Sequence, residues 1–363
     1  MKKLLKNLFL VTIPMLLVLF ILLEILSRIF FPGSERPNVF YDEANGIVKY
    51  GRDNGTRGLF TIGKFEQQRG RWRVNNDGWN SPVDYFTGKK QGVTRIAVIG
   101  DSYIEAWQVD AEEKYPSVLD NLLGDKYEVY SFGVSASPLS QYLHVSRYVE
   151  KQYSPDIYIF NLIHNDFHES INGLTYTPFF MTLKMDNDGT FTEIQPVKPE
   201  RSHNKIPGGN ILKRSSFFRW VYDNLKLKER FISKDGAKEA EMNVAVSDIM
   251  DKKDSIKAVA GYLFRKIKAE LGNKRIIFVM DAPRTNIYSG DMDKSKVAWL
   301  NTMAADYCKE LGMEFIDLTI PMTEGYTKNK KHFESEYDNH WSKYGHEFVA
   351  GIVYKYLTTA KSN

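Results

Sequence analysis

The sequence has a single cysteine, Cys308, among its 363 residues, and it has no internal repeat or low-complexity tract. One cysteine cannot form a disulfide within the chain, so the cysteine content leaves the redox compartment open. Cys308 lies on or near the apolar stripe of a helical pattern, and we expect a small buried side chain rather than a reactive thiol. A strong excess of charge is also missing, because the net charge is +4 and basic and acidic residues are interleaved. This balance argues against a nucleic-acid partner.

An apolar segment at the N-terminus stands out against this ordinary composition. It runs from residue 8 to residue 23 and continues to residue 31, past Glu24 and Arg28. Three lysines precede it: Lys2, Lys3 and Lys6. The segment is long enough to span a bilayer with some tilt. Glu24 and Arg28 are spaced i, i+4, so they can pair on one helix face near the far interface.

An uncleaved membrane anchor explains this segment better than a signal peptide does. A signal peptide would have a shorter apolar stretch and a small-x-small cleavage site, which the sequence LSRIFFPGS does not offer. The leading lysines predict a cytoplasmic N-terminus, and this orientation places everything after Pro32 on the other side of the membrane. We therefore expect residues 1–32 to form a cytoplasmic tip and transmembrane anchor, with the rest of the chain outside the cytoplasm.

The remainder of the chain divides into a lead-in segment and a domain in which strands alternate with helices. Residues 33–91 are rich in Gly, Asn, Arg and aromatic residues, which predicts short strands and turns. In residues 92–363, the expected strands are 95–99, 128–132, 156–163, RIIFVM from Arg275 and MEFIDL from Met313. The expected helices are 114–123, 139–150, 254–271, 294–311 and 343–357.

Short, continuously apolar strands separated by helices predict a parallel sheet that is covered on both faces. The expected fold class is therefore α/β, a flavodoxin-like three-layer α/β/α sandwich with a five-stranded parallel sheet, preceded by the transmembrane helix. An insertion at about residues 167–251, between the third and fourth strands, is too long for a plain connection. We expect it to form a small packed subdomain. A cap over the substrate is the alternative, because lids on such sheets usually come from long loops.

Ligands bind outside the carboxyl ends of the strands in such sheets, so the residues that follow the strands are the ones that can carry chemistry. The first strand ends in Gly100-Asp101-Ser102, the second reaches Gly133, and the third is followed by Asn165-Asp166. The segment YDNHWSKYGHEF, just before the last helix, contains Asp338 and His340. The topology thus predicts that a serine, a glycine, an asparagine and a histidine with an aspartate meet at one sheet edge.

This set of residues, in this chain order, resembles the SGNH or GDSL-like hydrolases, a family named for its Ser, Gly, Asn and His. The resemblance covers about residue 95 to the C-terminus, outside the insertion. Two departures stand out. Ile163 occupies the position where the family's third block commonly has glycine, which bears on how the backbone places Asn165. Asp338 and His340 are two residues apart rather than three, a spacing of membrane-anchored members and of some polysaccharide O-acetyltransferases.

The residue types fit nucleophilic catalysis on an ester without reference to any family. A serine hydroxyl needs a base to remove its proton, and His340 can supply a neutral imidazole for Ser102. On an extended segment, Asp338 projects to the same side as His340 and can orient the ring. The backbone N–H groups of Ser102 and Gly133 and the side-chain amide of Asn165 would form the oxyanion hole. We expect glycine at position 133 because a side chain there could block the acyl group.

Two further residues are weaker candidates for substrate contact. His164 adjoins Asn165, although on a strand its side chain should point the opposite way. Arg284, in the segment DAPR after the fourth strand, could meet an anionic substrate, but a solvated or salt-bridged arginine is the commoner outcome. The other histidines considered, His168, His203, His332 and His346, lack metal-ligand spacing, and we expect no metal and no cofactor.

The sequence as a whole predicts an extracytoplasmic serine esterase that acts through an acyl-enzyme. The family resemblance implies that its ester substrate is an O-acyl group, such as an O-acetyl group, on a cell-surface carbohydrate. Its other expected partner is the lipid bilayer, through the N-terminal helix, and no nucleic acid is expected. Two alternatives remain open. A polysaccharide O-acyltransferase would use the same residues but pass the acyl group to a sugar hydroxyl, and a non-catalytic scaffold of envelope polymer assembly would keep only the fold.

Overall fold

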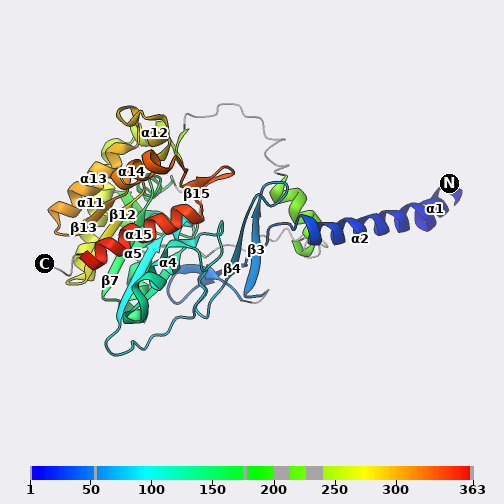
Figure 1. Ribbon diagram of the computed structural model, residues 1–363, viewed down its shortest axis with the longest axis horizontal. Helices are drawn as coiled ribbons and strands as arrows, with labels where there is room; N and C mark the ends of the chain where they lie inside the picture. The colour runs from blue at the N-terminus through cyan, green and yellow to red at the C-terminus, as the bar shows by residue number, and fades with distance from the viewer. Residues whose placement is uncertain (1, 53–54, 175–177, 199–212, 226–239, 360–363) are drawn as a thin grey trace.

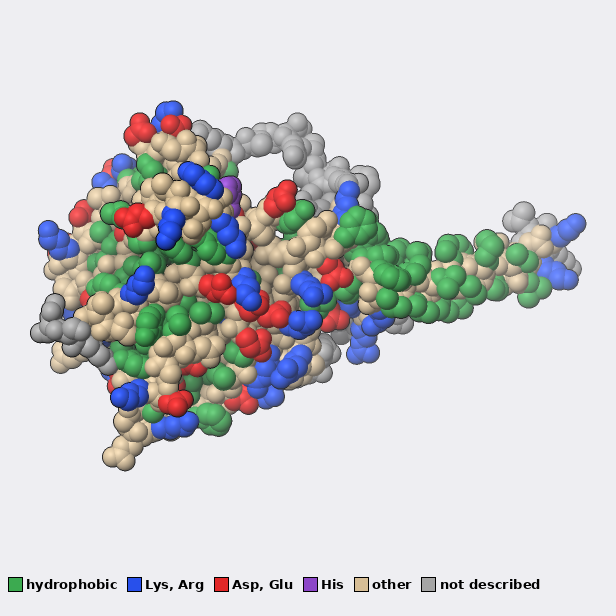
Figure 2. Space-filling view, in the orientation of Figure 1, with side chains coloured by type: hydrophobic (Ala, Val, Ile, Leu, Met, Phe, Trp, Pro, Cys, Tyr) green, Lys and Arg blue, Asp and Glu red, His purple; other side chains and the backbone are tan. Residues whose placement is uncertain are grey.

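The computed structural model of the protein describes residues 2–359 except 53–54, 175–177, 199–212 and 226–239. A globular part is built around one sheet, and a long N-terminal helix projects from it (Figure 1). This helix is continuous through α1 (Lys2–Asn7), the π-helical η1 (Leu8–Thr12) and α2 (Ile13–Phe30). Within Leu5–Phe30, a stretch of 18 residues has a mean hydropathy of 2.8, and 0% of that stretch is buried. The helix is therefore long and apolar enough to cross a membrane, and Figure 2 shows hydrophobic side chains along its length.

The central sheet has five parallel strands, as the sequence predicted. They are β5 (Thr94–Gly100), β6 (Tyr127–Gly133), β7 (Ile157–Leu162), β12 (Arg275–Met280) and β13 (Glu314–Asp317). Their order across the sheet is β13-β12-β7-β5-β6. This is the flavodoxin-like order 2-1-3-4-5, in which the chain reverses direction across the sheet between β5 and β7. The predicted fold class is confirmed, and the reversal point falls beside Ser102.

Helices cover both faces of the sheet. The expected helices are α4 (Tyr115–Leu123), α5 (Leu139–Tyr153), α11 (Lys253–Leu271), α13 (Ala298–Glu310) and α15 (Lys343–Thr359). Alternate residues of β5 enter two separate cores, Ala97 and Ile99 on one face and Ile96 and Val98 on the other. Burial on both faces is what makes these strands continuously apolar. Cys308 is fully buried, as expected, and burial raises the pKa of its thiol.

Among the described residues, the longest helix of the domain that was not predicted is α14 (Thr319–Asn329). Its sequence, TIPMTEGYTKN, has no clear apolar stripe and contains a proline and a glycine, which favour a loop in a single-sequence interpretation. Pro321 falls in the first turn, where its missing N–H costs nothing. A Cβ at Gly325 would lie 2.8 Å from the ring of Phe348, so glycine allows this helix to pack closely.

The lead-in segment contains the short strands that the sequence predicted. They form two antiparallel hairpins, β1 (Val39–Asp42) with β2 (Ile47–Tyr50) and β3 (Arg57–Ile62) with β4 (Gln68–Arg73). Trp72 of β4 and Trp107, which follows the helix that begins at Ser102, belong to the same small apolar cluster. The lead-in segment is therefore packed against the chain that carries the candidate nucleophile.

The described parts of the insertion pack in three different places, so a single small subdomain is not what they form. The hairpin of β8 (Thr182–Met185) and β9 (Phe191–Ile194) joins the core on the α5 side. The helical turn α8 (Ser216–Arg219) packs on α2, and the following turn η3 (Trp220–Asn224) packs on β3. The hairpin β10 (Ala240–Glu241) and β11 (Val244–Ala245) precedes α10 (Val246–Met250). The aromatic residues of the insertion thus pack against different parts of the protein. His203, which is also in the insertion, lies outside the described residues.

Candidate active site

Ser102 lies at the turn between strand β5 and the short helix α3 (Ser102–Glu105). Asp101 caps this helix, because its Oδ1 accepts a hydrogen bond of 2.9 Å from the backbone N–H of Tyr103. Asp101 and Tyr103 are buried, whereas Ser102 remains partly exposed. Asp101 therefore fixes a turn that presents the Ser102 hydroxyl at the carboxyl edge of the sheet.

Asp338, His340 and Ser102 form a continuous chain of hydrogen bonds. Asp338 and His340 lie on β15 (Asp338–Trp341), which pairs with β14 (Glu334–Ser335). His340 Nε2 is 2.8 Å from Ser102 Oγ, and His340 Nδ1 is 2.6 Å from Asp338 Oδ1. The side chains of His340 and Asp338 are 21% and 19% exposed. The i, i+2 spacing thus points both side chains toward Ser102, as in a serine-hydrolase triad.

Asp338 is held in the ionised form that such a triad needs. Burial alone would raise the pKa of Asp338, but hydrogen bonds from His340 and Gln108 and the attraction of His340 hold it below its ordinary range. Gln108 Nε2 donates to Asp338 Oδ2 at 3.0 Å. Gln108 is a positioning residue that sequence reasoning missed, because it is near the triad only through the fold.

Gly133 lies against the backbone of α3. This contact explains why the residue is glycine, and it differs from the explanation that the sequence suggested. A Cβ at position 133 would lie 2.3 Å from the backbone nitrogen of Glu105 and 2.9 Å from the carbonyl oxygen of Asp101. We expected a side chain at position 133 to block the acyl group. The structure shows instead that such a side chain would clash with the backbone of the helix that carries Ser102. Glycine allows the end of β6 to approach the Ser102 turn this closely.

Asn165 immediately precedes the short helix α6 (Asp166–Glu169) and is 8% exposed. Its side chain lies close enough to Glu169 to lower the pKa of that carboxyl against the effect of burial. A primary amide has two N–H groups, so one donor remains when the other is used by a carboxylate. Asn165 can therefore still donate to a substrate oxygen.

The backbone at position 163 accommodates isoleucine, although glycine is common at this position in the SGNH family that the sequence resembles. Its side chain is fully buried in the core that also contains Tyr103 and Ile104. Asp166 closes the turn, because its Oδ2 accepts a hydrogen bond of 2.7 Å from the backbone N–H of Ile163. Ile163 has no positive φ, so an ordinary L residue fits the backbone here.

The two weaker candidates for substrate contact are buried away from solvent, which corrects that expectation. His164 is 0% exposed, its Nε2 is 3.0 Å from Asn301 Oδ1, and burial lowers its pKa to about 4. Arg284, the first residue of α12 (Arg284–Ser289), is 1% exposed. It pairs with Asp281 at 3.2 Å and with Glu334, so the alternative of a salt-bridged arginine is the one observed.

Arg284 instead supports the backbone that carries the triad. It donates hydrogen bonds to the carbonyl oxygen of Asn339 at 2.7 Å and to the hydroxyl of Tyr103 at 2.8 Å. Tyr103 also donates to the Asn339 carbonyl at 2.9 Å, and its ring lies 4.8 Å from that of His340. The guanidinium therefore ties the residue between Asp338 and His340 to the helix of Ser102.

We expect Arg284→Met to lower the free energy of unfolding by about 3 to 5 kcal/mol, because it leaves Asp281 buried without its cation. Urea denaturation measures this loss. Arg275→Met is the matched control, since Arg275 pairs with Glu314 at 2.7 Å but is 26% exposed, and we expect it to cost about 1 kcal/mol or less. Equal losses in the two variants would contradict the support role of Arg284.

We also expect Glu169 to make the stability depend on pH. Burial, together with the nearby charge of Asp101, raises the pKa of Glu169 from 4.5 to about 7 against the hydrogen bond from Asn165. The stability that this group contributes is complete below about pH 4.5 and is lost as the pH rises through about 7. Glu169→Gln should therefore gain about 1 to 3 kcal/mol relative to wild type between pH 4.5 and pH 8. Denaturation of both proteins at the two pH values measures this difference in the free energy of unfolding. A difference that does not change with pH would contradict the raised pKa of Glu169.

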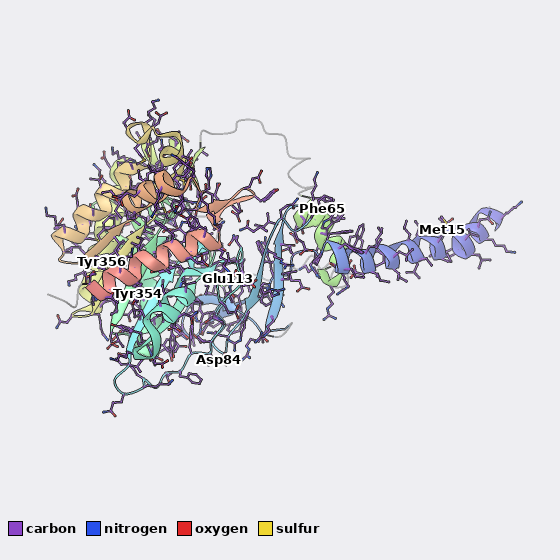
Figure 3. The ribbon with its side chains drawn as sticks, in the orientation of Figure 1. Met15, Phe65, Asp84, Glu113, Tyr354 and Tyr356 are labelled. Atoms are coloured by element: carbon purple, nitrogen blue, oxygen red, sulfur yellow. The ribbon has the colours of Figure 1, made fainter. Side chains whose placement is uncertain are left out.

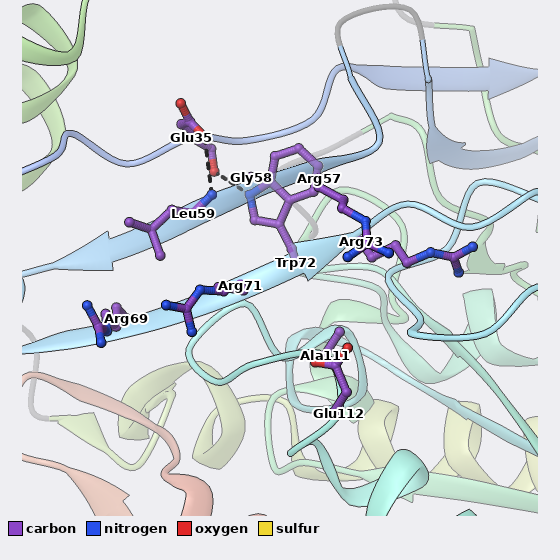
Figure 4. A pocket seen from close by; sticks show the side chains of 10 residues that line it. All are labelled: Glu35, Arg57, Gly58, Leu59, Arg69, Arg71, Trp72, Arg73, Ala111 and Glu112. Atoms are coloured by element: carbon purple, nitrogen blue, oxygen red, sulfur yellow. Dashed lines mark hydrogen bonds between the residues drawn. The ribbon is translucent and has the colours of Figure 1, made fainter. Parts of the chain in front are cut away.

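A cavity of about 400 Å³ lies on the β3–β4 hairpin (Figure 4). Four arginines contribute to its lining: Arg57, Arg69, Arg71 and Arg73. Arg71 and Arg73 are paired with Asp110 at 3.2 Å and with Asp84 at 2.6 Å. None of Ser102, Asp338 and His340 lines this cavity, so it is distinct from the candidate active site.

Solved structures with an outline similar to this chain include several bacterial ester hydrolases. The lipase/acylhydrolase from Enterococcus faecalis is 12% identical, with 74% of this chain and 97% of that chain covered and a TM-score of 0.39. The acetyl xylan esterase AlAXEase is 12% identical, with 72% and 98% covered and a TM-score of 0.40. A member of the lipolytic protein G-D-S-L family from Veillonella parvula DSM 2008 is 11% identical, with 73% and 99% covered and a TM-score of 0.38.

No protein-family model and no curated protein matches the chain. At these identities and TM-scores, the similar structures assign neither an activity nor a catalytic residue to it. What the chain can do chemically is therefore argued from its own side chains at the sheet edge.

Proposed function

We propose that the protein is a membrane-anchored, extracytoplasmic serine esterase of the SGNH type that removes O-acyl groups, O-acetyl groups above all, from a cell-surface carbohydrate. The observation that carries the proposal is the hydrogen-bond chain from Asp338 through His340 to Ser102, with distances of 2.6 Å and 2.8 Å. This is the geometry in which an imidazole can take the proton of an attacking serine.

In the proposed reaction, Ser102 Oγ attacks the ester carbonyl carbon while His340 Nε2 takes the hydroxyl proton. Asp338 stabilises the imidazolium that forms and keeps Nδ1 protonated. The Asn165 amide and the backbone N–H groups of Ser102 and Gly133 stabilise the charge on the carbonyl oxygen. His340 then gives its proton to the leaving sugar oxygen, which leaves an acyl-Ser102. A water molecule, deprotonated by His340, attacks the acyl carbon; the bond to Ser102 Oγ breaks, His340 returns its proton to Oγ, and the carboxylic acid is released.

The proposed location rests on the N-terminal helix. Leu5–Phe30 is apolar enough to span a bilayer, and the basic side chains Lys3 and Lys6 lie at its N-terminal end. Positive residues stay on the cytoplasmic side, so the globular part would lie outside. A carbohydrate substrate is supported by the two-residue spacing of Asp338 and His340, which resembles that of membrane-anchored SGNH proteins and some polysaccharide O-acetyltransferases.

Product analysis tests the proposal. The full-length protein is incubated with an O-acetylated polysaccharide, with and without an unacetylated acceptor sugar, and free acetate and acetylated acceptor are both measured. Free acetate in both conditions supports the esterase. Acetyl transfer to the acceptor in place of acetate release would overturn it in favour of an O-acyltransferase. Failure of the folded protein to react with a fluorophosphonate probe would favour a non-catalytic scaffold.

A further inference from the structure

A short stretch of the insertion, Ser215–Leu225, is bound to the side of the N-terminal helix. Glu24 of α2 accepts hydrogen bonds from the Ser215 hydroxyl at 2.6 Å and from the backbone N–H groups of Ser216 and Phe217, each at 3.0 Å. Arg28 completes the cluster with a 2.7 Å contact to the same carboxylate. The Glu24 carboxylate, which interrupts the apolar helix, therefore finds its hydrogen-bond donors in the insertion as well as in Arg28.

The contact continues toward the N-terminus of the helix, into its uninterrupted apolar part. The ring of Phe20 lies 5.4 Å from that of Phe218 and 6.5 Å from that of Phe217. Phe20 precedes Glu24 by four residues, which is about 6 Å along a helix. Any bilayer position that places the apolar run in hydrocarbon therefore also places these two phenylalanines of the insertion beside hydrocarbon.

The other side of this stretch is polar and is fixed to the globular part. Asn224 donates hydrogen bonds of 3.0 Å to the Thr61 hydroxyl and to the carbonyl oxygen of Gly63. Arg219 contacts Glu35 at 3.0 Å. The stretch therefore contacts α2 on one side and the β3–β4 hairpin and Glu35 on the other.

Large apolar side chains remain exposed around this junction. Tyr222 is 63% exposed, Phe218 is 38% exposed, and Phe65, at the tip of the β3–β4 hairpin, is 72% exposed. Figure 3 shows Phe65 beside the end of α2, on the side of the globular part from which Met15 and the helix extend. Trp220 packs its ring 4.7 Å from Phe31 and donates its indole N–H to the carbonyl oxygen of Lys64 at 2.8 Å. Aromatic residues of this kind are enriched where a membrane meets water.

We propose that Ser215–Leu225 and Phe65 form a membrane-docking surface that inserts into the outer leaflet beside α2, with phospholipid acyl chains as its partner. The inference rests on the proposed function, because it takes α2 to span the membrane with the globular part outside the cytoplasm. The surface is continuous with α2, so the apolar area of the helix and of the docking surface enters lipid together. The consequence is that the candidate active site is held at a set distance and orientation above the bilayer, instead of moving freely on a single helix.

Depth measurement in lipid tests the proposal. Cysteine is introduced singly at Tyr222, Phe65, Met15 or Ile320 and labelled with the environment-sensitive dye NBD, since Cys308 is fully buried. The full-length protein is placed in phosphatidylcholine vesicles that contain lipid with a doxyl quencher at acyl carbon 5. We expect at least twofold quenching at Tyr222→Cys and Phe65→Cys. Ile320→Cys is the matched control, because Ile320 is 71% exposed on α14, away from the helix, and it should not be quenched.

The outcomes separate this inference from the proposed function. Quenching at Met15→Cys but none at Tyr222→Cys would overturn the docking surface and leave the anchor intact. Absence of quenching at Met15→Cys as well would overturn both the docking surface and the proposed anchor. In the Tyr222→Cys background, we expect Glu24→Ala to reduce quenching to the Ile320 level, because the stretch loses its three hydrogen bonds to α2. Unchanged quenching would overturn the role assigned to Glu24.

Discussion

Ser102→Ala is expected to lower kcat for hydrolysis of an aryl acetate by about 10⁴- to 10⁶-fold and to abolish labelling by a fluorophosphonate probe. The physical reason is that the reaction loses the atom that attacks the ester, Ser102 Oγ, which lies 2.8 Å from His340 Nε2. The oxyanion donors and the binding surface remain, so a small residual rate above the uncatalysed reaction is also expected. Steady-state kinetics and gel-based detection of the labelled protein measure the two effects.

The matched control is Ser255→Ala. Ser255 lies within α11, where alanine is a good helix former, and α11 contains none of the three triad residues. This variant should keep both wild-type turnover and wild-type labelling. Thermal unfolding of both variants checks that Ser102→Ala is folded. Full turnover by a folded Ser102→Ala variant would rule out the proposed mechanism.

The second large effect is expected for Asp338→Asn, which should lower kcat by about 10⁴-fold. The substitution removes the charge that stabilises the His340 imidazolium. Gln108 Nε2 faces Asp338 Oδ2 at 3.0 Å, so an amide nitrogen at that position would meet another donor. Unless Gln108 itself reorients, the new amide turns its NH₂ group toward His340 Nδ1. Nδ1 must then accept, Nε2 carries the proton, and the ring can no longer take a proton from Ser102.

Kinetics on the aryl acetate measure this loss, and Glu336→Gln serves as the control because Glu336 is an exposed acid on the same hairpin. That variant should retain wild-type kcat. The double variant Asp338→Asn with Gln108→Glu adds a test of the cause, because a carboxylate at 108 accepts from the amide and leaves its oxygen to face His340. We expect it to recover part of the lost rate. A kcat for Asp338→Asn within about 10-fold of wild type would contradict the assigned role of Asp338.

The fold was predictable because its signals are local. The five strands of the sheet are largely apolar, since helices cover both faces of the sheet, and each strand is followed by a helical period. The Ser102 turn and the pair of Asp338 and His340 could be placed at one edge because the carboxyl ends of parallel strands share that edge. Helix α14 was missed because its contacts, and not its own residues, stabilise it.

The neighbours of the triad could not be predicted from local patterns. Arg284 looks like a candidate for an anionic substrate at the end of a strand, yet it is 1% exposed and paired with Asp281 and Glu334. Gln108 reaches Asp338 across 230 residues of sequence. The insertion carries aromatic residues whether it forms a subdomain, a cap or a docking surface, and composition does not distinguish these.

The sequence by itself determined the apolar N-terminal helix, the flavodoxin-like sheet and the set of chemically capable residues at its edge. Periodicity and strand ends are encoded by neighbouring residues, which is why they can be recognised without the fold. Only the tertiary structure decided that His340 Nε2 meets Ser102 Oγ, that Gly133 is required by the backbone of α3, and that Ile163 fits where glycine is common. It also decided that Ser215–Leu225 binds α2. These contacts join residues far apart in the chain, and their geometry depends on packing that no local pattern records.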